Sequence, residues 1–311
     1  MSFKKVVVCG SGVLGSQIAY QTAFKGFDVT IWVRSEGSIE RAKPKLERLK
    51  NIYLETLEAM KTVPEAYCRG LADKTDLSDE EIDALKEKAI EAYDSLKITT
   101  SYEEAGEDAD FIIEAIAEDP EQKIAFYTEL QKHLPEKTVI ATNSSTLLPS
   151  QFAEYTGRGE KYLALHFANN IWRSNTAEVM GHANTDKKYF DQVIEFAEEI
   201  GMVPIPVKKE QPGYVLNSLL VPFLSAAQVL WANDIADPEI IDLTWKLASG
   251  APEGPFQIID YVGLTTAYNI SIMHPDAQDP NSQQGVVVRK LKEKIDKGET
   301  GINAGKGFYE Y

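Results

Sequence analysis

The chain is poor in cysteine and in positive charge. Of its 311 residues only Cys9 and Cys68 are cysteines, and their spacing matches neither a disulfide framework nor a metal-ligand pattern. Lys and Arg number 32 against 48 Asp and Glu, which gives a formal net charge of -16. Because non-specific binding to nucleic acid depends on neutralising phosphates with Lys and Arg, nucleic acid is excluded as a partner. We expect no metal site and a cytoplasmic protein with reduced cysteines.

Long hydrophobic runs are also missing. No stretch of about 18 apolar residues occurs, so the sequence predicts no membrane-spanning helix and no membrane partner. The N-terminus is basic and then apolar, but Gly10 interrupts the apolar run after a few residues. We therefore interpret it as a first strand rather than a signal peptide.

An alternation of short apolar runs and helical stretches fills most of the chain. The predicted strands are residues 5–9, 28–33, 96–100, 110–115, 138–142, 162–166, 177–180 and 203–207. A charged helical hairpin over residues 39–93 interrupts the alternation. This pattern predicts an α/β fold of the doubly wound type, with a mostly parallel sheet.

The pattern changes after residue 212, where long apolar helical periodicity replaces the strands. Single cores rarely exceed about 250 residues, so a chain of this length suits two domains. We predict one domain over residues 1–208 and an all-helical one over 209–311. Aromatic and apolar positions between residues 214 and 231 lie at helical spacing, and we interpret them as packing.

Three glycines follow the first strand in the pattern Gly10-x-Gly12-x-x-Gly15 and open a helix. Such a turn lets a pyrophosphate approach bare backbone at a helix N-terminus, which carries positive potential. Because the strand, turn, helix and second strand occur in the required order, the sequence predicts a dinucleotide-binding domain.

Arg34 and Ser35 follow the second strand, where NAD enzymes usually carry Asp or Glu for the ribose hydroxyls. A guanidinium and a hydroxyl there suit a 2′-phosphate, which favours NADP over NAD. The alternative is that Arg34 is solvated and Glu36 reaches the ribose of NAD.

His166 ends one predicted strand and Glu178 lies in the next. A carboxylate beside an imidazole fixes its tautomer and stabilises the imidazolium, as a general base requires. A His–Glu pair is more often a structural contact, so these residues alone leave the role open. Ser145 follows a strand and could bind a substrate oxygen or cap a helix, while Asn217 interrupts an apolar helix and is expected to face a polar cleft.

Nearly the whole chain resembles the 3-hydroxyacyl-CoA dehydrogenase family. Besides the glycine turn, the matching segments are residues 113–118, 143–145, 166–167, 177–179, 212–217, 254–256, 260–264 and 305–309.

The resemblance implies an NAD(P)-dependent oxidoreductase that interconverts 3-hydroxyacyl-CoA and 3-ketoacyl-CoA. It implies that His166 is the base, that Glu178 orients it, and that Ser145 and Asn217 position the substrate oxygen. It also implies that the nicotinamide-ribose side of the site is lined by Glu118, Lys123 and Asn169, and that the helical domain forms a homodimer.

Two other interpretations stay open. One is a dehydrogenase of a free hydroxy acid, similar to L-gulonate 3-dehydrogenase and lambda-crystallin, which residues 144–150 somewhat resemble. The other is a dinucleotide-binding protein without catalytic activity, against which the intact set of Ser145, His166, Glu178 and Asn217 argues.

Overall fold

The computed structural model describes residues 3–311. Contacts between residues divide the chain into two compact units, one ending at Val215 and the other covering Leu216–Tyr311. Each unit is described by itself. Within residues 3–311, no helix combines the length and the apolar character needed to cross a membrane.

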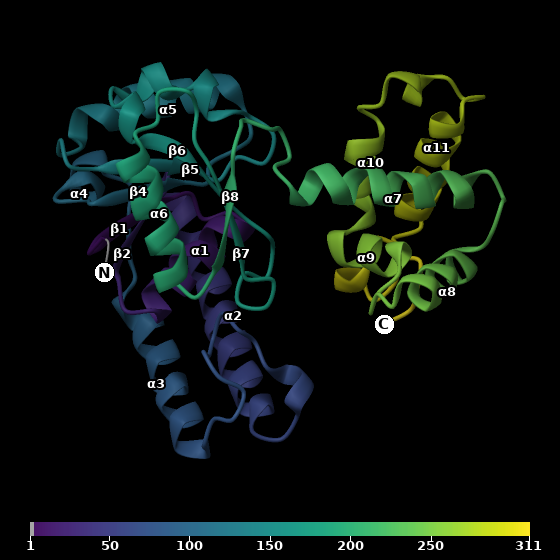
Figure 1. Ribbon diagram of the computed structural model, residues 1–311, viewed down its shortest axis with the longest axis horizontal. Helices are drawn as coiled ribbons and strands as arrows, with labels where there is room; N and C mark the ends of the chain where they lie inside the picture. Colours follow the sequence, from purple (N-terminus) through teal and green to yellow (C-terminus); the bar gives the residue numbers. More distant parts are fainter. Residues whose placement is uncertain (1–2) are drawn as a thin grey trace. The chain divides into compact units, whose positions relative to one another are not determined.

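The first unit is built on an eight-stranded sheet (Figure 1) with the strand order β3-β2-β1-β4-β5-β6-β7-β8. The strands are β1 (Lys5–Cys9), β2 (Asp28–Trp32), β3 (Lys97–Thr99), β4 (Phe111–Glu114), β5 (Val139–Thr142), β6 (Tyr162–Phe167), β7 (Thr176–Met180) and β8 (Val203–Val207). The first six strands are parallel, and β7 and β8 run the opposite way. The predicted α/β class and all eight strands are confirmed.

Apolar residues fill both faces of this sheet, as expected for parallel strands covered on two sides. Val6 and Val8 belong to one core, and Val7 and Cys9 to the other, because successive strand residues point to opposite faces. The first core is covered by α1 (Val13–Phe24), α2 (Glu36–Met60), α3 (Asp79–Ser95) and α6 (Lys187–Glu199). The second is covered by α4 (Tyr102–Gly106) and α5 (Pro120–Leu130).

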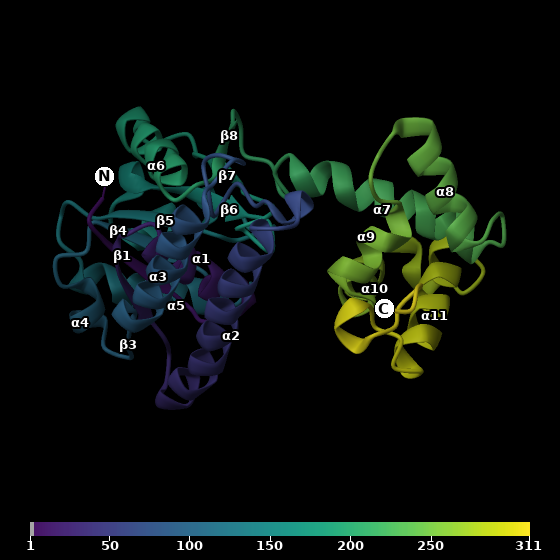
Figure 2. The same ribbon diagram turned by 90° about the horizontal axis from the view of Figure 1, so that it is seen from below.

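The helical hairpin predicted over residues 39–93 consists of α2 and α3, which run side by side (Figures 1 and 2). Its second helix begins at a capping box. The hydroxyl of Ser78 accepts from the Glu81 amide at 3.3 Å, and the Glu81 carboxylate accepts from the Ser78 amide at 2.9 Å. The sequence Ser-x-x-Glu therefore fixes the start of α3 by satisfying two amides at its first turn.

Strand β8 lies at the edge of the sheet and contains Pro204 and Pro206. Proline lacks the amide proton that a central strand needs, so this strand suits an edge position. Its neighbour β7 pairs antiparallel with β6 in a register that places Glu178 opposite His166.

The second unit is all helical, as predicted. It contains α7 (Leu216–Ala232), α8 (Pro238–Ser249), α9 (Pro255–Val262), α10 (Leu264–Ser271) and α11 (Gln283–Asp296). Buried apolar residues of α7, α9, α10 and α11 form its core. The buried carboxylate of Asp260 anchors the C-terminal segment by accepting from the amides of Phe308 at 2.8 Å and Tyr309 at 2.9 Å.

Candidate active site

The side chains of His166 and Glu178 are brought together by the β6–β7 register. His166 Nδ1 lies 2.9 Å from Glu178 Oε2, and the two residues are 4% and 3% exposed. An ionised carboxylate can only accept, so Nδ1 carries a proton and donates it. The second oxygen of Glu178 accepts from the Val215 amide at 2.9 Å. In the neutral ring this arrangement leaves Nε2 as the acceptor, which is the state a general base requires.

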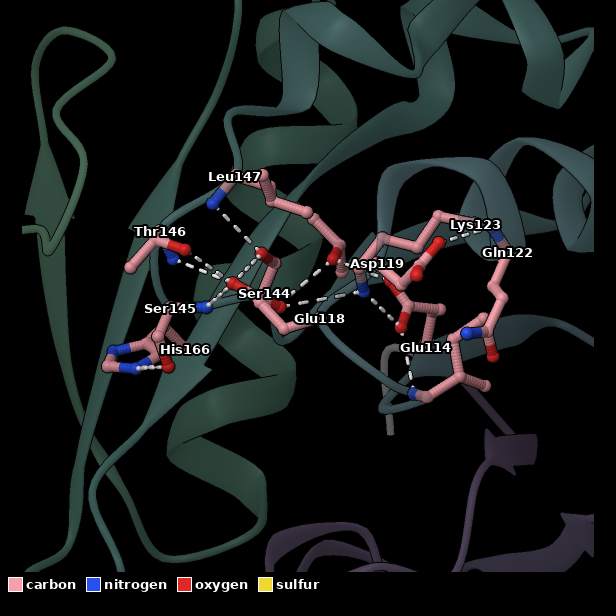
Figure 3. Close-up of polar contacts among 12 residues, drawn as sticks. Glu114, Glu118, Asp119, Gln122, Lys123, Ser144, Ser145, Thr146, Leu147 and His166 are labelled. Atoms are coloured by element: carbon pink, nitrogen blue, oxygen red, sulfur yellow. Dashed lines mark hydrogen bonds and ion pairs between the residues drawn. The ribbon is translucent and has the colours of Figure 1, made fainter. Parts of the chain in front are cut away.

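Ser145 faces that acceptor. Its loop follows β5, and its hydroxyl oxygen lies 3.1 Å from His166 Nε2 (Figure 3). The structure therefore joins three of the predicted residues, Ser145, His166 and Glu178, in one hydrogen-bonded chain. A hydroxyl at this position can hold a substrate oxygen within reach of Nε2.

Glu118 organises the loop that carries Ser145. One of its carboxylate oxygens accepts from the hydroxyl of Ser144 at 2.6 Å, the amide of Ser145 at 3.1 Å, and both the amide and the hydroxyl of Thr146 at 2.9 Å (Figure 3). Burial raises the pKa of Glu118, but these donors and the charge of Lys123 outweigh burial and lower the pKa below its ordinary value. Glu118 is therefore an ionised side chain directly beside Ser145.

Lys123 lies behind Glu118, in a buried polar cluster. Asp119 and Pro120 start α5, so Lys123 falls in its first turn and points inward. The ammonium, 1% exposed, lies 2.6 Å from the buried carboxylate of Glu114 and 3.8 Å from Glu118. Glu114 also accepts from the hydroxyls of Tyr127 and Thr142, each at 2.7 Å. The Lys123 ammonium thus places a positive charge beside the Glu118 carboxylate. Lys123 does not line the cavity that Glu118 lines.

Tyr214 is a neighbour of His166 that the sequence interpretation treated only as packing. Its ring stacks on the imidazole, with centroids 4.5 Å apart and planes within 7° of parallel. Its hydroxyl donates to the Ser144 carbonyl at 2.8 Å. The signal in the sequence was its position directly after Gly213, since both residues take the left-handed backbone conformation of a tight turn.

The glycine turn has the geometry that a dinucleotide demands. A Cβ at Gly10, whose φ is 118°, would meet the Ala115 carbonyl oxygen at 2.4 Å, and one at Gly15 would meet the Gly10 carbonyl oxygen at 2.3 Å. A Cβ at Gly12 would meet nothing within 4 Å. The first and third glycines are therefore required for packing, while the second leaves bare backbone open at the N-terminus of α1, where a pyrophosphate fits.

A cavity of about 300 Å³ joins the glycine turn to the Ser145 loop. It is lined by Gly12, Val13, Leu14, Gly15, Ala115, Ile116, Glu118, Asn143, Ser144, Ser145 and Thr146. The glycine turn that would hold a dinucleotide and Ser145, which contacts His166, therefore line the same cavity of the first unit.

Arg34 and Ser35 follow β2 and are both exposed. The Arg34 guanidinium donates to the Gln122 side chain at 3.2 Å. The Ser35 hydroxyl lies 3.0 Å from that of Ser38, which accepts from Arg41 at 2.7 Å. The end of β2 and the start of α2 therefore offer two guanidinium groups and two hydroxyls that suit a phosphate, beside the exposed carboxylate of Glu36.

Two predicted residues lie outside this group. Asn169 is exposed in the loop that follows β6. Asn217 is half-buried in the first turn of α7 and belongs to the second unit. Their roles stay predictions. Among residues 3–311, no three His, Cys, Asp or Glu side chains gather as metal ligands would.

A glycine-rich dinucleotide turn at the start of a doubly wound sheet is typical of nicotinamide-dependent dehydrogenases. The comparison with known families agrees. Residues 5–211 match the NAD-binding domain of 3-hydroxyacyl-CoA dehydrogenase, and residues 213–311 match the C-terminal domain of the same enzyme. The chain belongs to the 3-hydroxyacyl-CoA dehydrogenase family, as the sequence resemblance predicted.

Individual relatives span the whole chain. Human mitochondrial hydroxyacyl-coenzyme A dehydrogenase is 30% identical over 99% of this chain and 91% of that protein. The 3-hydroxybutyryl-CoA dehydrogenase of Clostridioides difficile is 29% identical over 99% of both chains. Among solved structures, a diketoreductase described as acting on dicarbonyl compounds is 47% identical and covers 100% of both chains, with a TM-score of 0.84.

Proposed function

We propose that this protein interconverts a 3-hydroxyacyl-CoA and its 3-ketoacyl-CoA with a nicotinamide dinucleotide, and that His166 is the general base. The observation that carries the proposal is the chain Ser145–His166–Glu178, with 3.1 Å from Ser145 Oγ to Nε2 and 2.9 Å from Nδ1 to the carboxylate. Family membership supports the redox step. The intact hydrogen-bonded chain of these three residues argues against a protein that binds the dinucleotide without turnover.

In the oxidation, Nε2 of His166 would accept the proton of the substrate hydroxyl, and a bound nicotinamide would supply the acceptor for the hydride of the carbon that carries this hydroxyl. Glu178 stabilises the imidazolium that forms and keeps the ring in one tautomer. Ser145 holds the substrate oxygen beside Nε2. We propose that Asn217 contributes a second contact to that oxygen. In the reduction, the imidazolium returns its proton to the oxygen.

The proposed dinucleotide site uses Gly10, Gly12 and Gly15 for the pyrophosphate. Arg34 and Ser35 would hold a 2′-phosphate, which favours NADP(H), and NAD(H) is the alternative. The exposed Arg34 and the Ser35–Ser38–Arg41 contacts support this preference. On the nicotinamide-ribose side, Glu118, Lys123 and Asn169 would belong to the site, with the Lys123 ammonium 3.8 Å from the Glu118 carboxylate.

We also propose a division of roles along the chain. Residues 1–208 would bind the dinucleotide, and residues 209–311 would contribute to substrate binding and to a homodimer. Exposed apolar side chains on the second unit, among them Leu243 and Leu247 of α8, support a self-associating surface. A cytoplasmic location is part of the same proposal.

A dicarbonyl compound without CoA is the second candidate substrate. It is favoured by the 47% identity to the diketoreductase, which exceeds the identity to the two acyl-CoA dehydrogenases compared above. The acidic start of α3 also offers little for the phosphates of CoA. Both candidates keep the same redox step. The family match supports the acyl-CoA and the likeness to the diketoreductase supports the dicarbonyl compound, whereas neither favours an L-gulonate-type hydroxy acid.

An absorbance assay separates these possibilities. Oxidation of NADH and NADPH is followed at 340 nm with acetoacetyl-CoA, free acetoacetate and a simple 1,3-diketone. A kcat/KM for acetoacetyl-CoA that is about 100-fold above the others, a difference of roughly 2.7 kcal/mol, identifies the acyl-CoA substrate. A kcat/KM that is highest for the 1,3-diketone identifies the dicarbonyl compound. Failure of all three to oxidise either cofactor contradicts the proposal.

A further inference from the structure

Tyr214 contacts two parts of the candidate active site, and the amide of the next residue contacts a third. It is 1% exposed and lies between β8 and α7, in a turn where Gly213 and Tyr214 have φ of 78° and 52°. A non-glycine residue seldom takes this conformation, and it persists only where the surroundings demand it. The turn places the Tyr214 ring against His166 and the following amide, that of Val215, on Glu178.

The stacked ring of Tyr214 restricts a rotation of the His166 ring that the hydrogen bonds of His166 permit. Glu178 holds the His166 ring at Nδ1 and Ser145 holds it at Nε2. These two contacts still permit the ring to rotate about the line that joins the two nitrogens. A second flat ring 4.5 Å away and nearly parallel blocks that rotation on one side. The electron-rich face also favours an imidazolium, the state that forms when the base accepts a proton.

The hydroxyl of Tyr214 has a separate task. It donates to the Ser144 carbonyl at 2.8 Å, while the amide of the same peptide unit, that of Ser145, donates to Glu118 at 3.1 Å. Both ends of the peptide that carries the Ser145 side chain are therefore held. Burial, together with the charges of Glu118 and Glu178, raises the pKa of the Tyr214 hydroxyl, so it stays a neutral donor.

We propose that Tyr214 is a positioning residue, which sets the plane of the His166 ring through stacking and clamps the Ser144–Ser145 peptide through its hydroxyl. The inference rests on the proposed role of His166 as base. It assigns Tyr214 no contact with reacting atoms. The effect of its stacking on turnover should therefore require His166 to be present.

The test uses two variants and a matched pair of controls. Tyr214→Phe keeps the stack and loses the clamp, whereas Tyr214→Leu loses both. Tyr20 offers the control, because it is also fully buried and its hydroxyl also donates to a backbone carbonyl, that of Ala89, away from His166. Tyr20→Phe and Tyr20→Leu measure what a buried tyrosine contributes to stability alone.

We expect Tyr214→Leu to lower kcat by roughly 10- to 100-fold, the range that a small misplacement of a catalytic group causes, with cofactor Kd nearly unchanged. Loss of the aromatic face should move the acidic limb of the pH profile of kcat/KM by about half a unit toward lower pH. Tyr214→Phe should lose about 2- to 10-fold in kcat, as one misaligned hydrogen bond would cause, without that shift. The Tyr20 variants should lower Tm with kcat unchanged.

A double-mutant cycle with His166→Ala decides the inference. In that background Tyr214→Leu should cost no more than Tyr214→Phe, since the ring that stacking positions is gone and only the clamp on the Ser144–Ser145 peptide remains. If the loss of Tyr214→Leu beyond that of Tyr214→Phe is the same with and without His166, or if both Tyr214 variants keep the wild-type kcat and pH profile, the inference is overturned and the proposed function stays intact. Full turnover of His166→Ala alone would instead overturn the proposed function. If Tyr214→Leu does not fold, Tyr214→Phe still tests the clamp, and a wild-type kcat in that variant would overturn the inference.

Discussion

His166 and Glu178 are directly opposed residues of β6 and β7, which form the one antiparallel pairing among the eight strands of residues 3–311. Opposed residues of paired strands point to the same face, so the register itself sets the 2.9 Å contact between imidazole and carboxylate. Because β7 runs opposite to β6, Glu178 lies beside His166 near the carboxyl end of β6.

Glu178→Gln tests whether the charge of this acid matters. The amide oxygen can still accept from Nδ1, but it cannot stabilise an imidazolium. We expect kcat to fall by about 10²- to 10⁴-fold with little change in cofactor Kd. Steady-state kinetics and fluorescence titration of the cofactor measure the two quantities. Glu129→Gln, on the surface of α5, is the matched control and should leave both unchanged, whereas a Glu178→Gln enzyme with normal kcat would contradict the role.

Glu118 should make stability depend on pH. Its folded pKa lies below the ordinary value of 4.5, so its contribution is present above about pH 4.5 and is lost as the pH falls through the lower folded value. At pH 7 we expect Glu118→Gln to reduce the free energy of unfolding by about 1 kcal/mol, a small figure because the side chain is 39% exposed. Urea unfolding of both proteins at pH 7 and pH 3.5 measures the difference, which should shrink at the lower pH. A difference that grows in acid would rule out the depressed pKa.

The buried pair Glu114–Lys123 should be intolerant of single substitutions. Lys123→Met leaves the carboxylate buried without its cation and should destabilise the protein by about 3–5 kcal/mol. The double variant Glu114→Gln with Lys123→Met should recover part of that loss, because no uncompensated charge remains. Denaturant unfolding of the two single variants and the double variant checks this. Additive losses in the double variant would show that the two groups act independently.

Arg34 should distinguish the two dinucleotides. We expect Arg34→Asp to weaken NADPH binding by at least about 10-fold more than NADH binding, since it replaces the guanidinium suited to a 2′-phosphate with a repelling charge. Fluorescence titration with each cofactor gives the ratio. Arg289→Asp, which alters a surface arginine of α11, controls for net charge. Equal losses for both cofactors would remove Arg34 from this role.

Local patterns were sufficient for the scaffold. The spacing of Gly10, Gly12 and Gly15, the alternation of apolar runs, and the Ser78–Glu81 capping box each depend on residues close in sequence, and the structure contains all of them. The nearness of His166 and Glu178 followed from two successive strands, because consecutive strands usually pair.

Long-range contacts were the part that the sequence did not reveal. Tyr214 reaches Ser144 across 70 residues, and its ring meets His166 only because the Gly213–Tyr214 turn has left-handed geometry. Periodicity classified it as packing, since aromatic residues at helical spacing usually are. Lys123 was predicted at the cofactor site, and that role stays a prediction. Its burial beside Glu114 depends on how α5 packs on the sheet, which no local pattern encodes.

The central claim is that His166 moves the proton in the redox step. It is tested most directly by measuring, for His166→Ala, both kcat with the best substrate and the Kd of the preferred cofactor. The account predicts a fall in kcat of about 10³-fold or more, with a Kd within about twofold of wild type, because the ring handles the proton and the glycine turn holds the dinucleotide. Undiminished kcat in this variant would contradict it.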